Sequence, residues 1–364
     1  MAEITIEREG PIETSSIDRE LELLLQDQKT RIKVVGCGGG GGNSISRMKE
    51  IGIKGCELIA INTDAQDLLY TNADSKILIG RELTHGLGAG SNPKIGEEAA
   101  KESEQEIKKK LTNSDMVFIT CGEGGGTGTG AAPVVAEVAK KQGALTIGVV
   151  TLPFTVEGKK RLENAQYGLE RLESIVDTLI VIPNDKLLEL APELPLHTAF
   201  KVADEILTNA VKGIAELITS TGLVNLDFAD VKAVMVNGGA SLIGIGESDS
   251  SSDRATEAIN RAINNPLLDV DIKNAKGALI NVIGGPDMTL DEYKIVMEII
   301  GKKISPDAKI ISGARISEDM EKSIKVMLII TGVQSSQILG TNIGLRKGKE
   351  QELESELGIK FFEE

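Results

Sequence analysis

The sequence has few of the residues on which several classes of protein depend. Tryptophan is absent, and aromatic residues make up only 2% of the 364 residues. A platform of stacked aromatic side chains for single-stranded nucleic acid is therefore not expected. There are two histidines and three cysteines, with no C-x-x-C spacing, which argues against a histidine-based metal site, a zinc site and a disulfide framework.

Long hydrophobic runs and a basic surface are missing as well. No window reaches the roughly 18 apolar residues of a membrane span. The opening residues, MAEITIEREGPIETSS, are acidic and polar, unlike a signal peptide. We therefore expect a cytoplasmic protein without direct membrane insertion. The formal net charge of −15 repels phosphate backbones and anionic lipid, so nucleic acid is not an expected partner.

What is present is the pattern of a two-domain globular chain, with 41% hydrophobic and 26% charged residues. Up to about residue 183, continuous apolar strands alternate with helices, one of them at 94–112, which is typical of a doubly wound parallel sheet. One long amphipathic helix is predicted from Thr198 to about Thr221. Beyond it, helices are predicted only at about 252–264 and 289–303, and strands follow one another, which indicates an α+β region. These strands are predicted at 231–240, 277–285, 308–316 and 323–331.

Two glycine-rich segments each follow a predicted strand and precede a predicted helix. They are GCGGGGG at 36–42 and GEGGGTGTG at 122–130, and we expect both to be loops. Such segments place backbone N–H groups and a helix N-terminus at the carboxyl edge of a parallel sheet, where phosphate binds. A single segment of this kind could simply be a tight turn between a strand and a helix, but two of them in one sheet favour a ligand-binding site.

The kind of phosphate ligand is less sharply defined by these residues. The first loop fits the dinucleotide fingerprint G-x-G-x-x-G, and Asp64 would be its ribose partner, although later than the usual spacing of about 20 residues. A dinucleotide-dependent enzyme is therefore one alternative. The second loop argues against it, and no G-K-[ST] closes either loop as in Walker A. The layout suits a triphosphate, neutralised by backbone amides, helix dipoles and a metal, with Thr127 and Thr129 adding hydroxyl donors.

The second loop also carries a family resemblance. Residues Gly124–Gly130 fit the signature small-G-G-T-G-small-G of the tubulin superfamily. The first loop, Gly36 to Asn43, and the segment NLDFAD at 225–230 resemble its prokaryotic FtsZ branch, and the resemblance runs from about 31 to about 345. It implies a cell-division GTPase that binds GTP and GDP, needs Mg²⁺ and polymerises head to tail. A tubulin-like filament for cell shape or DNA segregation is the alternative.

By matching position, the resemblance implies nucleotide contacts from several segments. They are Gly38, Gly39, Gly40, Gly41, Gly42 and Asn43 in the first loop; Gly88, Ala89 and Gly90 at the γ-phosphate; Gly125, Gly126, Thr127, Gly128 and Thr129 in the second loop; Glu157 and Arg161 at the ribose; and Asn184, Phe200 and Asp204 at the guanine. A carboxylate can accept both donors of the guanine edge, N1–H and N2–H₂. Spacing alone favours a core role for Phe200 and a solvated one for Asp204, and the resemblance reverses this.

The acidic segment raises a geometric question. Asp204 lies near the start of the long helix, and Asp227 and Asp230 lie beyond its end. About 18 helical residues separate these sites by roughly 27 Å. If Asp227 and Asp230 are catalytic, with Asn225 shaping the loop, they must act on the nucleotide of the neighbouring subunit. The local alternative is that they form Asx turns and a helix N-cap.

The expected organisation has five parts. They are an N-terminal extension with a short helix at 1–30, a GTP-binding domain at 31–197, a connecting core helix at 198–222, an α+β domain with the catalytic loop at 223–345, and a charged tail at 346–364. The expected partner is a second copy of the chain, with division-protein adaptors besides, at the division site. Magnesium is expected to be held by phosphates and water, with no protein ligand assigned.

Overall fold

The computed structural model describes residues 30–190, 195–219, 223–224, 226–251, 253–268 and 272–333. The predicted short helix within 1–30, the loop residue Asn225 and the charged tail at 346–364 lie outside the described residues. Among the helices of the described part, none combines the length and the apolar character needed to cross a membrane.

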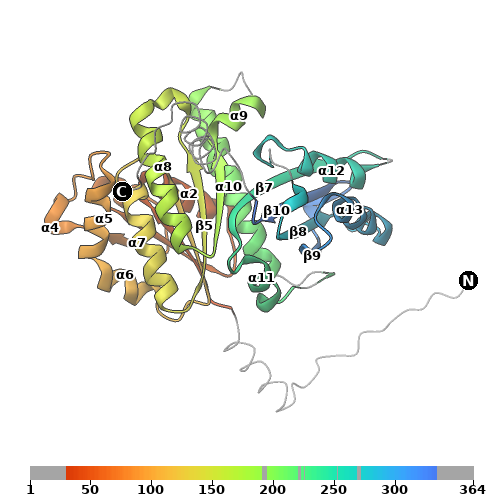
Figure 1. The fold of residues 1–364 in the computed structure, drawn as a ribbon, viewed down its shortest axis with the longest axis horizontal. Helices are drawn as coiled ribbons and strands as arrows, with labels where there is room; N and C mark the ends of the chain where they lie inside the picture. The colour runs from red at the N-terminus through yellow and green to blue at the C-terminus, as the bar shows by residue number, and fades with distance from the viewer. Residues whose placement is uncertain are drawn as a thin grey trace, which may run out of the picture. The chain divides into compact units, whose positions relative to one another are not determined.

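Ten strands of the described part form one sheet, in the order β3-β2-β1-β4-β5-β6-β7-β10-β8-β9 (Figure 1). The strands are β1 (Ile32–Cys37), β2 (Cys56–Asn62), β3 (Ser75–Leu78), β4 (Met116–Gly122), β5 (Leu145–Leu152), β6 (Thr178–Pro183), β7 (Gly239–Ser248), β8 (Gly277–Gly284), β9 (Lys309–Ile316) and β10 (Ile324–Thr331). All neighbours pair in parallel except β10, which is antiparallel to both β7 and β8. The predicted combination of a parallel doubly wound part and a mixed α+β part is confirmed.

The sheet is continuous across the two parts, because Thr178–Ile180 of β6 pairs in parallel with Gly239–Ser241 of β7. Its first six strands have the order 3-2-1-4-5-6 of a doubly wound fold. From β1, the strands β2 and β3 are added on one side and β4, β5 and β6 on the other, so the strand order reverses between the parallel neighbours β1 and β4. Ligands of such sheets bind at this reversal, outside the carboxyl ends of the strands.

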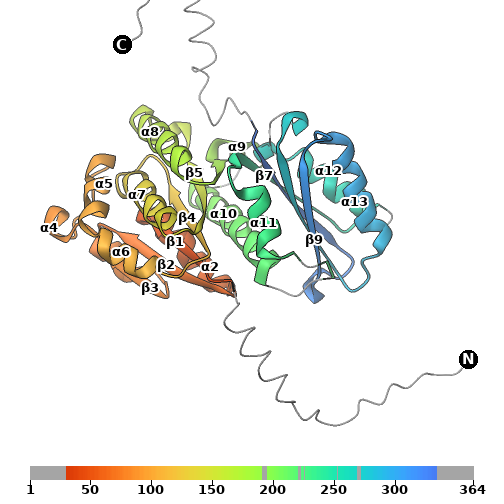
Figure 2. The same ribbon diagram turned by 60° about the horizontal axis from the view of Figure 1, so that its bottom comes forward.

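Each face of the sheet carries one hydrophobic cluster, as the alternation of side chains along a strand requires. Val35 belongs to one cluster and its neighbour Val34 to the other. The Val35 face is covered by α5 (Pro93–Glu102), α6 (Glu104–Leu111), α7 (Thr127–Lys141), α8 (Lys159–Ile175), α12 (Arg254–Ile263) and α13 (Leu290–Lys303). The Val34 face is covered by α2 (Gly38–Ile51), α10 (Leu196–Thr219) and α11 (Phe228–Met235). Figure 2 shows α12 and α13 beside the C-terminal strands.

The long helix α10 connects the two parts of the sheet. It packs against α2 and β5 on the nucleotide-loop side and against β8 on the other. Its buried residues Leu207, Val211 and Ile214 follow helical spacing. The helix predicted from Thr198 to about Thr221 is therefore confirmed, with observed bounds Leu196–Thr219.

Four local predictions were wrong. The strand predicted at 231–240 begins only at Gly239, the first residue of β7, and is preceded by the helix α11 and a turn, because the capping box of Asp227 and Asp230 starts a helix there. The predicted loop at 122–130 becomes helical from Thr127 onward. The predicted loop at 36–42 becomes helical from Gly38 onward. The single helix predicted at 94–112 breaks at Ser103, whose hydroxyl accepts a hydrogen bond from Gly80 N–H.

Candidate functional site

A cavity of about 380 Å³ lies at the carboxyl ends of β1, β4, β5 and β6, where the sheet order reverses. Its size is within the range of small-molecule sites. It is lined by the two glycine segments, by the start of α8, and by residues of α9 (Asn184–Leu190) and α10. The lining residues are Cys37, Gly38, Gly39, Gly40, Asn43, Gly122, Glu123, Gly125, Gly126, Thr127, Gly128, Thr151, Pro153, Glu157, Arg161, Asn184, Phe200, Ala203 and Asp204.

The two glycine segments pack directly against each other. Gly38 has φ 71°, and a Cβ atom there would lie 2.8 Å from the backbone nitrogen of Gly128. Only glycine permits this left-handed start and this close approach. The glycines disfavour a helix by about 1 kcal/mol each, but the contact holds the first turn of α2 in place. The N-termini of α2 and α7, neither with an acidic residue in its first turn, therefore lie together at the cavity.

The second segment is supported from behind by the chain between β3 and α5. A Cβ atom on Gly126 would lie 2.8 Å from Asn92 N and 2.9 Å from the Cβ of Ala89. Within the segment, Gly124 N–H donates to Thr129 Oγ1 at 2.9 Å. Thr129 is fully buried and holds the loop rather than lining the cavity.

Several other residues of the implied nucleotide set also lie outside the lining. They are Gly41, Gly42, Gly88, Ala89 and Gly90. Gly41 and Gly42 face the body of the protein, and the Gly88–Gly90 turn adjoins the second glycine segment through Ala89. Asp64, the ribose partner of the dinucleotide alternative, caps α3 (Ala65–Tyr70) by accepting from Gln66 N–H and Asp67 N–H.

Polar groups converge at the α10 end of the cavity. Asp204 is half-buried, and Ser44 Oγ donates to its Oδ1 at 3.0 Å. Burial raises the pKa of Asp204 to about 6, while the Ser44 hydrogen bond acts in the opposite direction. Asn184 is buried, and its Oδ1 has no hydrogen-bond partner. An unmet acceptor of this kind in a cavity is a candidate ligand contact.

Aromatic and charged groups form the rest of this end. The ring of Phe200 is 39% exposed and stands edge-on to the buried ring of Phe154, with centroids 5.2 Å apart. At the start of α8, Arg161 forms an ion pair with Glu157, whose Oε1 also accepts from Phe154 N–H. Arg161 is the only cationic residue in the described lining, and it is already paired. A polyphosphate bound there would meet backbone amides rather than an unpaired cationic side chain of the described lining.

Six residues that line the cavity are not among those predicted from the sequence: Cys37, Gly122, Glu123, Thr151, Pro153 and Ala203. The most informative is Glu123, an acidic residue inside the second glycine segment. Its pKa is raised to about 7, because burial disfavours the charged form. The sequence shows a glutamate between Gly122 and Gly124, but only the packing shows that its carboxyl group is buried.

The acidic segment lies elsewhere. Neither Asp227 nor Asp230 lines the cavity, and both are exposed. Asp227 Oδ1 accepts from Asp230 N–H at 2.8 Å, and the Asp230 carboxylate accepts from Asp227 N–H, so the two cap α11 reciprocally. The local capping interpretation is therefore present in the structure. Each residue uses one carboxylate oxygen in this capping, and both side chains are exposed.

Comparisons with known proteins cover most of the chain. A model of the Tubulin/FtsZ family GTPase domain matches residues 31–192, and a model of the FtsZ family C-terminal domain matches residues 239–334. The chain is 60% identical over 344 residues to cell division protein FtsZ 1 of Methanocaldococcus jannaschii, covering 94% of each chain. It is 63% identical over 321 residues to cell division protein FtsZ 1 of Thermococcus kodakarensis, covering 88% of this chain and 86% of that relative.

Solved structures give the same picture of the fold. An empty FtsZ dimer from M. jannaschii superposes with a TM-score of 0.83 at 62% identity, covering 87% of this chain and 92% of that one. CetZ2 from Haloferax volcanii, solved as a GTPγS-bound protofilament, superposes with a TM-score of 0.75 at 19% identity, covering 89% of this chain and 100% of that one. The second likeness concerns the fold alone.

Proposed function

The chain belongs to the FtsZ family of the tubulin superfamily and is a cell-division GTPase, and we propose that it completes the hydrolytic site between two subunits. In this proposal GTP occupies the cavity at β1 and β4 of one subunit. Asp227 and Asp230 of the next subunit, with Asn225 shaping their loop, act on it. The filament is head to tail, because such a contact repeats without closing.

The cavity suggests how the nucleotide lies. The phosphates occupy the N-termini of α2 and α7, where backbone N–H groups and helix dipoles favour anions. The guanine lies at the α10 end, where Asp204 accepts its two donors and the unmet Oδ1 of Asn184 faces the cavity. Phe200 covers the base, the ribose adjoins Glu157 and Arg161, and the turn at Gly88–Gly90 responds to the γ-phosphate.

One observation carries the proposal that the acids act between subunits. Asp204 lines the cavity, whereas Asp227 and Asp230 do not, and the remainder of α10 separates them. From Asp204 to Thr219 the helix rises roughly 22 Å at about 1.5 Å per residue. Beyond it, Val224 bridges to Ala314 at the end of β9, which holds the acidic segment on the α+β part. These carboxylates cannot reach the nucleotide of their own chain.

Hydrolysis of GTP transfers a phosphoryl group to water, which requires positioning and charge stabilisation more than covalent help. Asp227 and Asp230 would orient and polarise the attacking water. Among the described residues, no cluster of three or more His, Cys, Asp or Glu side chains forms a metal cage. Our proposal has Mg²⁺ held mainly by phosphate oxygens and water, as is usual for that ion at nucleotides.

The cellular setting of the proposal follows from relatives. A relative at 62% identity forms a dimer, which supports self-association of this chain. We assign nucleotide binding to 31–197, the connecting helix to 198–222, and the α+β domain that bears the acidic loop to 223–345. We place the protein in the cytoplasm at the division site, with adaptor proteins as further partners. A role in cell shape or DNA segregation is less favoured, because the relatives at about 60% identity are named for cell division.

The first test is the GTPase rate per subunit against protein concentration. A site shared between subunits predicts a threshold, with specific activity near zero in dilute solution and rising as filaments form. Phosphate release and light scattering, recorded together, should share the same threshold. Full turnover by subunits that sedimentation shows to be monomeric would contradict the proposal.

The second test is complementation between two inactive variants. Asp204→Ala retains the acids but binds GTP poorly, and Asp230→Ala binds GTP but lacks an acid. Mixed together they should regain turnover, because the loop of the first can serve the nucleotide of the second. The matched control mixes Asp227→Ala with Asp230→Ala, which share the same defective loop and should not recover. No recovery in the first mixture, under conditions where the variants co-sediment, would contradict action between subunits.

A further inference from the structure

The carboxyl group of Glu123 has an environment unlike that of any other acid at the cavity. The residue lies in the second glycine segment, yet it is only 3% exposed. Its carboxyl group lies against α8, where a Cβ atom on Gly168 would lie 2.2 Å from Oε2. That oxygen has no hydrogen-bond partner. Burying a carboxyl oxygen without a hydrogen-bond partner lowers the stability of the fold, so we expect a function of this side chain.

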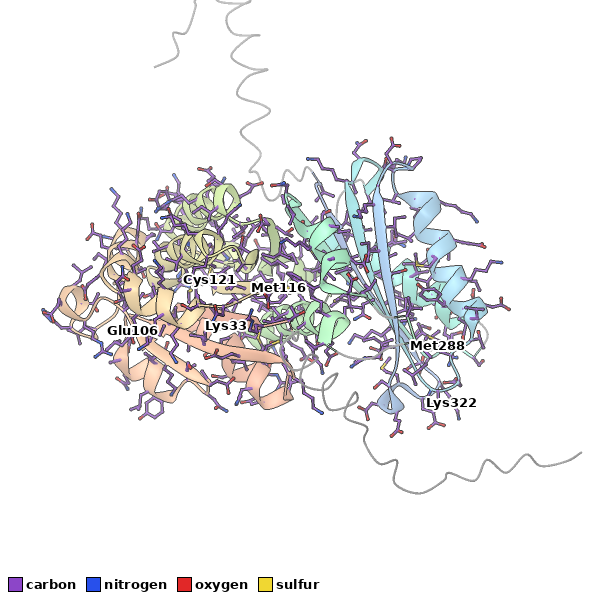
Figure 3. All side chains as sticks on the ribbon, turned by 90° about the horizontal axis from the view of Figure 1, so that it is seen from below. Lys33, Glu106, Met116, Cys121, Met288 and Lys322 are labelled. Atoms are coloured by element: carbon purple, nitrogen blue, oxygen red, sulfur yellow. The ribbon has the colours of Figure 1, made fainter. Side chains whose placement is uncertain are left out.

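The neighbours of Glu123 offer it no positive charge. From β4, the Cys121 thiol donates to Oε1 at 3.4 Å; Cys121 is labelled in Figure 3. Cys37 of β1 is the register partner of Cys121 and the second titratable group that interacts with Glu123. From α7 it meets the Thr129 hydroxyl, and from α8 the backbone at Gly168. Neither thiol is ionised near neutral pH, because burial raises the pKa of Cys37 to about 12 and holds the pKa of Cys121 well above its usual value.

The phosphates of a bound nucleotide would lie on the other side of the same loop. The chain from Gly124 to Gly128 separates them from the Glu123 carboxyl, and no unpaired cation of the described lining stands between. Like charges at short range in a region without water raise the pKa of a carboxyl group. An ionised Glu123 would also offset the positive end of α7, which is the main attraction for phosphate.

We propose that Glu123 sets the nucleotide affinity by taking up a proton when phosphates occupy the second glycine segment. The inference rests on the proposed placement of the phosphates there. In the empty protein the carboxyl group titrates near neutrality, with a pKa of about 7. Nucleotide raises this value, so binding and protonation favour each other. The side chain acts through the loop and does not touch the reacting atoms, so it is a positioning residue.

The direction of the pH dependence follows from linkage. Below the pKa of the empty protein, Glu123 is neutral in both states and the affinity is constant. As the pH rises above about 7, the empty protein loses the proton that the complex retains. The affinity then falls by up to about tenfold per pH unit until the complex also ionises. The terminal phosphate titrates at about pH 6, which is common to all variants, so the difference between variants isolates Glu123.

The test is calorimetry of GDP binding at pH 7.5 in two buffers of different ionisation enthalpy, which counts the protons taken up. Wild type should take up a substantial fraction of one proton more than Glu123→Gln, whose amide is neutral and of the same shape. From pH 6.5 to 8.5 the GDP affinity of wild type should fall several-fold more than that of Glu123→Gln. Glu173→Gln is the matched control, since Glu173 on α8 also has a raised pKa but does not line the cavity.

Two results separate this inference from the placement of the phosphates. Equal proton uptake by wild type and Glu123→Gln would overturn the role of Glu123. The variant Gly126→Ala tests the placement, because its Cβ would push the second segment against Asn92 and Ala89. If a folded Gly126→Ala binds GDP like wild type, the phosphates do not lie on this segment. An infrared difference spectrum gives an independent readout: a protonated-carboxyl band should appear on GDP binding to wild type and be missing in Glu123→Gln.

Discussion

The two ends of α10 satisfy their polar groups in opposite ways. At the cavity end, the Oδ1 of Asn184 and the Oε2 of Glu123 are buried without partners. At the other end, Asp227 and Asp230 are exposed and bond to each other's backbone N–H groups. At the first end, Asn184 lines the cavity, so its unmet acceptor is open to a ligand that enters there, whereas the Glu123 carboxyl group stays buried against α8. At the second end, the two acids meet each other's backbone N–H groups, and the action on a neighbouring subunit that we propose for them depends on contact with a second molecule.

The largest expected effect comes from a substitution that removes a charge at the acidic end without unfolding α11. Asp227→Asn keeps an oxygen that can cap α11, since asparagine is as good an N-cap as aspartate. It removes the charge that would orient the attacking water, and losses of about 10²–10⁴ are typical of such groups. We expect phosphate release above the assembly threshold to fall at least about a hundredfold, with GDP affinity and melting temperature unchanged. Asp253→Asn, at the exposed N-cap of α12, is the control. Near wild-type turnover of Asp227→Asn would remove this residue from the catalytic assignment.

The next largest effect is expected from a substitution at the cavity end, where it changes nucleotide affinity. Asp204→Asn replaces two acceptors by one acceptor and one donor, so a guanine donor loses its partner. Hydrogen bonds to charged groups contribute about 1.5–3 kcal/mol, and we expect GTP affinity to fall about 10- to 100-fold. Xanthine carries a carbonyl where guanine carries its amino group, so affinity for XTP should rise. Glu205→Gln, the exposed neighbour on α10, should change neither. Unchanged GTP and XTP affinities for Asp204→Asn would mean that the base lies elsewhere.

The buried acid at the cavity end should also affect stability. Burial raises the pKa of Glu123 from 4.5 to about 7, so the folded state favours the protonated form. The contribution of Glu123 to the free energy of unfolding is fully present below pH 4.5 and is lost as the pH rises through about 7. The loss above pH 7 is on the order of 3 kcal/mol, at about 1.36 kcal/mol per pKa unit. In urea unfolding without nucleotide, Glu123→Gln should gain stability over wild type at pH 8 and little at pH 5. The exposed Glu106→Gln should gain nothing, and equal curves for wild type and Glu123→Gln would show that Glu123 is well partnered.

The same contrast explains how much the sequence could predict. Continuous apolar strands, the two glycine segments and the spacing along α10 are local patterns, and the fold class follows from them. The strand prediction at 231–240 was wrong because the segment fits two periodicities. Val231, Val234 and Met235 have the spacing of one helix face, whereas Val231, Ala233 and Met235 have the alternation of a strand. The capping box at Asp227 favours the helix. In the sequence, this cap is predicted only as the alternative to a catalytic role for Asp227 and Asp230.

The cavity was partly predictable for a related reason. Glycine runs after apolar strands predict a ligand site at the sheet edge, and the family resemblance named Asn184, Phe200 and Asp204, which the structure places in the cavity lining. What the sequence could not show are contacts between distant segments. The helical start at Gly38 depends on Gly128, and the burial of Glu123 depends on the missing side chain of Gly168. Such contacts are fixed by packing, which no local pattern encodes.

The smallest expected effect sharpens the contrast within the cavity itself. Ser44 Oγ donates to Asp204 and also lies 3.1 Å from Gly40 O. The Ser44 hydroxyl therefore contacts the carboxylate that we propose binds the base. Asp204 must be ionised to accept two donors, so GTP affinity should rise with pH through its pKa of about 6, opposite in sign to the effect of Glu123. Ser44→Ala removes a bond that lowers this pKa, so the rise should shift to higher pH.

The measurement is GTP affinity from pH 5 to 8, made in the Glu123→Gln background, so that only the Asp204 transition remains. The loss for Ser44→Ala at pH 6 should be several-fold, as expected for a bond contributing about 1 kcal/mol, and should nearly vanish at pH 8. Ser46→Ala is the matched control, because Ser46 lies on the same helix and bonds only to Gly42 O and Asn72 N–H. If both variants share one pH midpoint, Ser44 does not orient Asp204. If instead only Ser44→Ala shifts the midpoint, the Ser44 hydroxyl sets the pH range over which Asp204 supports GTP binding.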